Sequence, residues 1–106
     1  MPRGLSALAF VAVAACGDKV DRVLAREGDP VAGARVWDSH CRECHAPDGT
    51  GTADGPDLTD DHDTADRLAE KVLYGWGEMP GFEDDLTVRE VADLIAFVEQ
   101  NVFLLP

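Results

Sequence analysis

Apolar residues recur at helical spacing in the middle of the chain. Between residues 64 and 74 they fall at positions that share one face of an α-helix: Ala65, Leu68, Ala69, Val72 and Leu73. Gly75 follows directly and ends the predicted helix, because glycine readily adopts the left-handed conformation common after a last helical turn.

A second apolar stripe lies near the C-terminus and consists of Val91, Leu94, Ile95 and Val98. Thr87 and Glu90 form a capping box ahead of it, in which each side chain bonds the backbone N–H of the other residue. Leu86 and Val91 add a hydrophobic staple. The sequence therefore predicts a helix that begins just after Thr87.

A further helix is predicted nearer the N-terminus, from Asp29 towards Ser39. Asp29 is a good N-cap, and Pro30 suits the first helical position. Gly33 and Trp37 are four residues apart and share a face, where a glycine lets another helix approach closely. This helix leads the chain directly to the cysteines that follow it.

Residues 46–63 are rich in Gly, Asp, Thr and Pro, which is the composition of a loop. Three helices without a convincing strand make the expected fold class all-α. The chain of 106 residues suits one small domain. Its folded part, about 75 residues, is small enough that a bound cofactor or metal often has to complete the core.

The first residues are typical of an export signal. Arg3 precedes an apolar run over residues 5–15, which is too short for a bilayer span of about 20 residues. Val13-Ala14-Ala15-Cys16 resembles a bacterial lipobox, so Cys16 is predicted to become the lipidated first residue of the mature chain. The alternative is ordinary cleavage after Ala14, which leaves Cys16 as a free thiol.

These features predict three segments. Residues 1–15 are a signal peptide of lipoprotein type, residues 16–28 are a lipidated N-terminus and tether, and residues 29–106 are the folded domain. The mature protein is therefore expected on the periplasmic side of a bacterial membrane, anchored by lipid.

The chain is strongly acidic, with a formal net charge of −12. This charge argues against nucleic-acid binding, which needs a basic face. It is consistent with protein partners that have basic docking surfaces, and equally with a generally acidic, salt-adapted proteome.

Cys41-Arg42-Glu43-Cys44-His45 is the motif with the most chemical information. At this spacing each thiol can form a thioether to a haem vinyl group, and the histidine can ligate the iron. A disulfide between Cys41 and Cys44 is one alternative. A thioredoxin-like site would need a βαβ frame, and a zinc site would need further ligands. The adjacent His45, the export signal and a downstream Met-Pro pair favour one covalently bound haem c.

Met79 is the candidate for the second iron ligand. It becomes the only methionine once Met1 leaves with the signal, and Pro80 after it stiffens the loop. A thioether ligand raises the reduction potential and fills the coordination sphere. The competing interpretations are a core-filling Met79 and iron ligation by His62. His40 is expected to be a surface residue or a polar cap.

These motifs resemble those of the class I c-type cytochromes, of the short single-haem bacterial kind. The resemblance extends over about residues 29–101 and rests on three groups of residues: Gly33 and Trp37 ahead of the C-x-x-C-H motif, Gly55-Pro56-x-Leu58, and Gly77-x-Met79-Pro80-Gly81-Phe82. It implies a small cytochrome c fold, with three main helices and loops wrapped around one covalently bound haem.

The resemblance also implies specific contacts. Gly33 and Trp37 would cross the last helix at Leu94, Phe97 and Val98, with Phe97 standing where the family often has tyrosine. The carbonyl of Pro56 would accept a hydrogen bond from the His45 imidazole and orient it towards the iron.

The expected function is one-electron transfer by a membrane-tethered periplasmic carrier with a His/Met-ligated haem, and not enzymatic catalysis. One alternative is a permanent haem-bearing subunit through which electrons enter a larger oxidoreductase complex. Another is a haem sensor or peroxidase with a displaceable sixth ligand.

Overall fold

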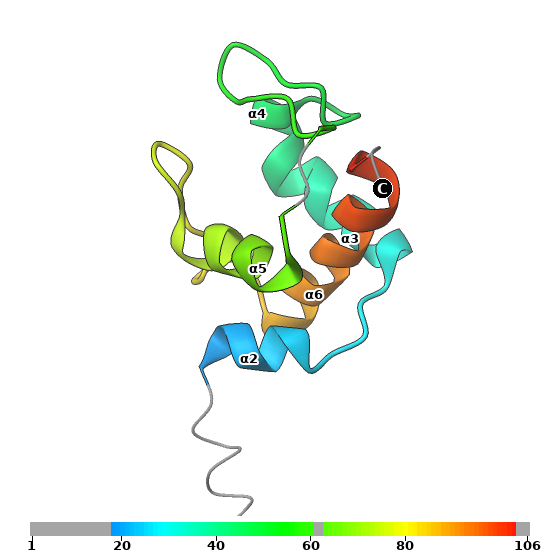
Figure 1. Cartoon of the computed structure of the whole chain (residues 1–106), viewed down its shortest axis with the longest axis vertical. Helices are drawn as coiled ribbons and strands as arrows, with labels where there is room; N and C mark the ends of the chain where they lie inside the picture. Colours follow the sequence, from blue (N-terminus) through cyan, green and yellow to red (C-terminus); the bar gives the residue numbers. More distant parts are fainter. Residues whose placement is uncertain (1–17, 61–62, 104–106) are drawn as a thin grey trace, which may run out of the picture.

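The computed structural model describes residues 18–60 and 63–103 (Figure 1). Within them the chain is helical, and its only β-type pairings are two isolated bridges. The elements in chain order are α2 (Lys19–Leu24), α3 (Pro30–Val36), η1 (Trp37–Cys41), α4 (Arg42–His45), α5 (Ala65–Tyr74), α6 (Val88–Phe97) and η2 (Val98–Val102), where η marks a π-helical turn. No helix in these two ranges is long and apolar enough to cross a membrane.

The predicted helix starts are confirmed by their caps. The Asp29 carboxylate accepts a hydrogen bond from the Val31 N–H at 2.9 Å. At α6, the Thr87 hydroxyl accepts from the Glu90 N–H, and the Glu90 carboxylate accepts from the Thr87 N–H, which completes the capping box. Helix α5 begins after Thr64 and ends at Gly75, whose φ of +90° suits glycine.

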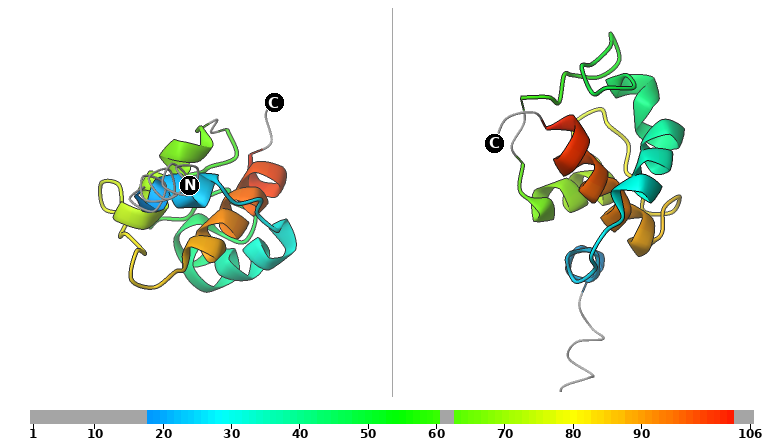
Figure 2. Two further views of the ribbon diagram at one scale, coloured as in Figure 1. Left: turned by 90° about the horizontal axis from the view of Figure 1, so that it is seen from below. Right: turned by 90° about the vertical axis from the view of Figure 1, so that its right-hand side faces the viewer.

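The crossing of α3 and α6 organises the core (Figures 1 and 2). Gly33 lies so close to α6 that a Cβ atom there would be 1.9 Å from the carbonyl oxygen of Asp93. One turn later, the Trp37 ring lies 5.8 Å from the Phe97 ring, measured between centroids. Trp37 is only 2% exposed, so this crossing forms the centre of the apolar core, as expected from the Gly33–Trp37 pair.

The stretch expected to be a tether contains a packed helix. Helix α2 is capped by Asp18, whose carboxylate accepts from the Asp21 N–H at 2.9 Å. Val23 of α2 is only 2% exposed, and α2 packs against α5 and α6. Its stability comes from these tertiary contacts, since an isolated helix of six residues is not stable in water. The part of the expected tether that the structure describes, residues 18–28, therefore includes a helix packed on the domain.

The two crossing helices, α3 and α6, each continue into a π-helical turn. α3 runs into η1 and then α4, so the chain stays helical as far as His45. α6 runs into η2, where Val102 is only 1% exposed and belongs to the core. Phe103 is half-buried against the same core, while Leu104 and Leu105 lie outside the described residues.

Candidate functional site

The two motif cysteines lie at the junction of η1 and α4. Cys41 is the last residue of η1 and is buried, whereas Cys44 is in the second half of α4 and is half-buried. Both thiols are free. Burial raises the pKa of Cys41 to about 12, with a smaller contribution from the neighbouring Cys44, so this thiol remains protonated at neutral pH.

The imidazole of His45 is hydrogen-bonded to the loop that follows α4. Its Nδ1 lies 3.0 Å from the carbonyl oxygen of Pro56. A carbonyl can only accept, so Nδ1 carries the proton, and in this tautomer Nε2 keeps its lone pair. Among the described residues no other hydrogen bond involves the ring. The side chain is 9% exposed, and its ring lies 6.1 Å from that of Trp37.

The loop after α4 folds back onto the motif and positions Pro56. The Thr52 hydroxyl donates to the Cys44 carbonyl at 2.7 Å, and the Gly51 N–H donates to the His45 carbonyl at 3.0 Å. Gly55 approaches closely, because a Cβ atom there would lie 2.6 Å from the Cys44 carbonyl oxygen. The glycines and Thr52 of this loop thus fix the proline carbonyl opposite the histidine ring.

Ala46, directly after His45, has an unusual backbone conformation with φ +70° and ψ 163°. L-residues other than glycine avoid this region, and it costs of order 1–3 kcal/mol. Three hydrogen bonds hold the residue there. Its carbonyl accepts from Trp37 Nε1 at 3.2 Å and from the Gly49 N–H at 3.3 Å, and its N–H donates to the Arg42 carbonyl at 2.9 Å. The turn ends α4 abruptly and directs the chain into the loop that carries Pro56.

Met79 lies on the loop between α5 and α6, where Trp76 and Met79 exchange two backbone hydrogen bonds of 3.1 and 2.9 Å. Gly75 allows this tight return, since a Cβ atom there would lie 2.7 Å from the Met79 carbonyl oxygen. Met79 is half-buried. In Figure 1 this loop, drawn in yellow, and α4 project separately from the helical body.

The structure therefore brings Cys41, Cys44, His45 and Pro56 together and places Met79 on a separate loop. His40 of η1 provides a link between them, because its ring packs edge-on against Phe82 at 5.5 Å, three residues after Met79. His40 was expected to be a surface residue or a polar cap, and no sequence signal indicated this contact. His62 and Cys16 lie outside the described residues.

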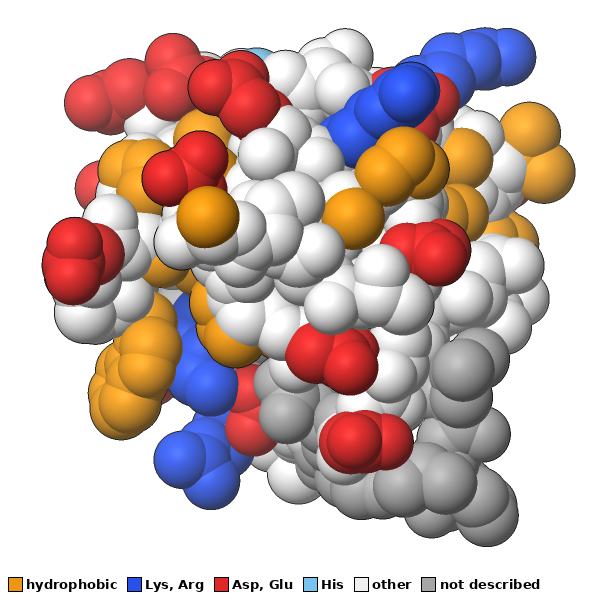
Figure 3. Space-filling model, turned by 90° about the horizontal axis from the view of Figure 1, so that it is seen from above, with side chains coloured by type: hydrophobic (Ala, Val, Ile, Leu, Met, Phe, Trp, Pro, Cys, Tyr) orange, Lys and Arg blue, Asp and Glu red, His pale blue; other side chains and the backbone are white. Residues whose placement is uncertain are grey.

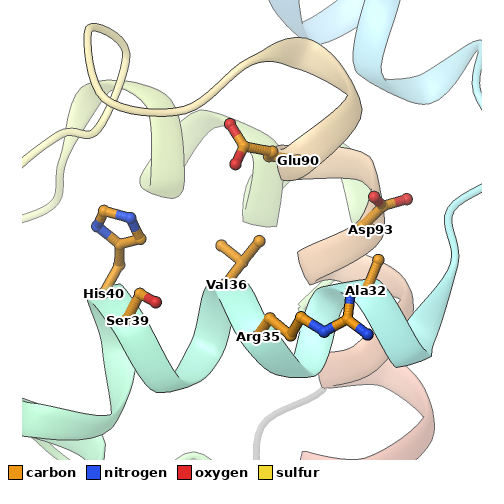
Figure 4. A pocket seen from close by; sticks show the side chains of 7 residues that line it. All are labelled: Ala32, Arg35, Val36, Ser39, His40, Glu90 and Asp93. Atoms are coloured by element: carbon orange, nitrogen blue, oxygen red, sulfur yellow. The ribbon is translucent and has the colours of Figure 1, made fainter.

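His40 also borders a cavity of about 250 Å³ between α3, η1 and α6 (Figure 4). Charged side chains of Arg35, Glu90 and Asp93 line it, and none of the predicted haem-binding residues does. A haem needs apolar walls and its attachment cysteines, so this cavity is distinct from the haem-attachment site.

The residues of the motif fit a covalently attached haem. Two free thiols lie one helical turn apart, and the adjacent imidazole has its Nδ1 bonded and its Nε2 lone pair available. Apolar side chains that are only partly buried border the core and can cover a porphyrin: Leu58, Leu68 and Phe82. When bound, the group supplies a redox-active iron, and the chain supplies its attachment, its histidine and its apolar cover.

Solved structures with a similar fold include two cytochromes cL. That from Hyphomicrobium denitrificans has 28% sequence identity and a TM-score of 0.59; the match covers 64% of this chain and 44% of that one. That from the marine methylotrophic bacterium Methylophaga aminisulfidivorans MPT has 27% identity and a TM-score of 0.60, with coverage of 67% and 51%. The chain thus matches only about half the length of these two proteins.

A third structure, described as the KustC0563 c-type cytochrome, is matched over most of its length. It has 27% identity and a TM-score of 0.59, and the match covers 64% of this chain and 94% of that one. No curated protein shows significant similarity to this chain. All three neighbours are c-type cytochromes, which identifies the fold as the small cytochrome c fold.

A protein-family model described as cytochrome c oxidase, cbb3-type, subunit III matches residues 28–98, which is more than half of the chain. The matched region contains the cysteine motif, the Pro56 loop and the Met79 loop. The chain therefore belongs to this family of class I c-type cytochromes, whose members bind haem c covalently and act as electron carriers.

Proposed function

We propose that this chain is a one-electron carrier in which Cys41 and Cys44 attach one haem c and His45 and Met79 bind its iron. The observation that carries the proposal is the 3.0 Å contact between His45 Nδ1 and the Pro56 carbonyl. This hydrogen bond orients the ring, leaves Nε2 for the metal and increases the basicity of the imidazole.

Met79 is the proposed second ligand because its loop is short, folded back and anchored. The Phe82 N–H donates to the Val72 carbonyl at 2.8 Å, so the chain returns to the end of α5 directly after the loop. A thioether in the sixth position leaves no open site for a substrate, and electron transfer then remains as the function. An open or displaceable sixth position would instead indicate a sensor or peroxidase.

Two measurements test the attachment and the ligands. Acid-acetone treatment should leave the colour with the protein, and extraction of haem into the organic phase would contradict covalent attachment. The oxidised protein should be low-spin and show a near-infrared sulfur-to-iron band that Met79→Ala abolishes. His62→Ala is the matched control and should leave that band unchanged. If instead His62→Ala removes the low-spin signal and Met79→Ala does not, the sixth ligand is His62.

The second part of the proposal concerns location. Cys16, in its lipobox-like context, carries lipid and anchors the domain to the periplasmic side of a bacterial membrane. α2, the first described helix, lies at the opposite end of the domain from α4 (Figures 1 and 2). A lipid anchor at Cys16, three residues before α2 begins at Lys19, therefore holds the haem-attachment motif on the side away from the membrane, where partners can reach it.

The intact mass of the membrane fraction tests the anchor, because it should include acyl chains on Cys16. Cys16→Ser should release soluble protein with an unchanged visible spectrum. A native mass without lipid, or membrane association that persists in Cys16→Ser, would contradict the proposed anchor.

Proteins that exchange electrons with this chain are expected to dock through basic surfaces. Figure 3 looks down on the end of the molecule that carries α4 and shows acidic side chains spread over this face, with apolar side chains between them and basic side chains near its margins. Opposite charges steer encounter, so the rate of electron exchange should fall as the salt concentration rises. A rate that does not depend on salt would contradict basic docking partners.

A second candidate function is a permanent haem-bearing subunit of a larger oxidoreductase complex. The description of the matched family, a subunit of a cbb3-type oxidase, favours this alternative specifically. Mild detergent extraction and affinity purification distinguish the two: a stoichiometric partner that remains bound at high salt indicates a subunit, and isolation of the chain alone indicates a mobile carrier.

A further inference from the structure

Lys71, in the last turn of α5, contacts two loops that approach it from different sides. Its Nζ lies 2.6 Å from Oδ2 of Asp63, in the segment that precedes α5. The same Nζ lies 5.0 Å from the centroid of the Trp76 ring, in the loop that follows α5. The two paired side chains are only 26% and 20% exposed. Water therefore screens this pair less than an ordinary surface ion pair.

The backbone of Trp76 is hydrogen-bonded to that of Met79, the proposed iron ligand. The Trp76 N–H donates to the Met79 carbonyl, and the Met79 N–H donates to the Trp76 carbonyl. The two residues thus form one rigid turn, and the position of the indole ring and that of Met79 depend on each other. Trp76 is 65% exposed, so apolar packing contributes little to holding this turn. The Lys71 ammonium over its ring therefore becomes the main anchor on this side.

We propose that Lys71 is a positioning residue that fixes the Trp76–Met79 turn against the segment containing Asp63 and thereby strengthens the hold of Met79 on the iron. This inference rests on the proposed ligation by Met79. Asp63 orients the ammonium, the ammonium holds the indole, and the paired backbone bonds transmit that position to Met79. Lys71 itself does not touch the haem-attachment residues.

Lys71→Met tests the proposal, because it keeps an unbranched apolar stem of similar size and removes the charge. The variant loses the ion pair with Asp63 and the ammonium–indole contact with Trp76. Each of these contributes modestly, and their combined loss should make the turn open roughly five- to tenfold more often. Cyanide should then displace Met79 with an apparent affinity raised by the same roughly five- to tenfold factor. The exchange of the Trp76 and Met79 amide hydrogens should accelerate in parallel. Lys71→Arg should restore both properties, since guanidinium also pairs with carboxylates and stacks on indole.

Lys19→Met is the matched control. Lys19 also forms an ion pair with a carboxylate, at 3.2 Å from Glu83, but in the described part of the chain the cation over the Trp76 ring is that of Lys71. It should leave cyanide affinity and the two amides unchanged. Trp76→Ala should reproduce the effect of Lys71→Met, and the double variant should be no worse than either single one, because both remove the same contact.

Wild-type values of cyanide affinity and amide exchange in Lys71→Met would overturn the proposal, as would an effect of equal size in Lys19→Met. Failure of the proposed Met79 ligation is recognised separately, because the oxidised wild-type protein would then lack the sulfur-to-iron band, since Met79 is the only methionine of the expected mature chain. In that case the exchange of the Trp76 and Met79 amides still decides whether Lys71 positions the turn.

Discussion

Gly33→Ala is the substitution that the α3–α6 crossing should tolerate least. The added Cβ would lie 1.9 Å from the Asp93 carbonyl oxygen, 2.6 Å from the Asp93 carbonyl carbon and 2.9 Å from the Phe97 Cβ. The first distance is at least about 1 Å shorter than ordinary non-bonded contact. Two of the three atoms belong to the backbone of α6, so a side-chain rotation cannot relieve the clash, and the helices must separate.

Three contributions determine the expected loss of folding stability in Gly33→Ala. Overpacking in a core typically costs about 1–3 kcal/mol, and a clash with backbone atoms belongs at the upper end. Separation also weakens the 2.8 Å hydrogen bond from the Asp29 N–H to the buried Asp93 carboxylate, worth about 1 kcal/mol. The higher helix propensity of alanine offsets about 1 kcal/mol of this destabilisation. The net loss is about 3 kcal/mol, or a fall in Tm on the order of 15 °C.

Thermal unfolding followed by circular dichroism measures this loss, with Gly77→Ala as the comparison. Nothing lies within 4 Å of a Cβ atom at Gly77, although its φ is +56°. That variant should lose only about 1 kcal/mol, through backbone strain. An unchanged or raised Tm in Gly33→Ala is the behaviour of an exposed helical glycine and would refute the close crossing.

Two further predictions concern the loop around the haem-attachment motif. Ala46→Gly should stabilise the protein by about 0.5–1 kcal/mol, because glycine removes the strain at φ +70°. The gain is limited because glycine also increases the entropy of the unfolded chain. Chemical denaturation measures the change in stability, and destabilisation would contradict the strained turn. Hydrogen bonds from the Thr59 hydroxyl and N–H lower the pKa of Asp57, so its stabilising contribution is present above its ordinary pKa and is lost as the pH falls through the lower folded-state value. Asp57→Asn should therefore flatten the acid limb of a plot of stability against pH, and an unchanged acid limb would show that Asp57 does not contribute.

Local signals predicted α5 and α6 well. The apolar periodicity of α5, its terminal Gly75 and the Thr87 capping box of α6 each depend on residues within a few positions of one another. Such signals act before any tertiary contact forms. Gly33 and Trp37 on one helix face also predicted the close approach of another helix, but it was the resemblance to class I cytochromes that identified the last helix as the partner.

The features that depend on distant residues were missed. Helix α2 is short and largely charged, and it is stable because Val23 packs into the core. The strained conformation of Ala46 is held by the Trp37 indole, nine residues away. The packing of His40 against Phe82 joins residues far apart in the sequence. The Pro56 contact with His45 was expected only from the resemblance to class I cytochromes, since no local pattern identifies which loop carbonyl faces the ring.

The most direct test of the central claim is the optical and near-infrared spectrum of the purified, exported protein in its oxidised and reduced states. We expect a low-spin haem that remains with the polypeptide in acid-acetone, a sulfur-to-iron band in the oxidised form, and no binding of carbon monoxide by the reduced form. A high-spin spectrum with ready carbon monoxide binding would contradict the account, because it would place an open coordination site where we assign Met79.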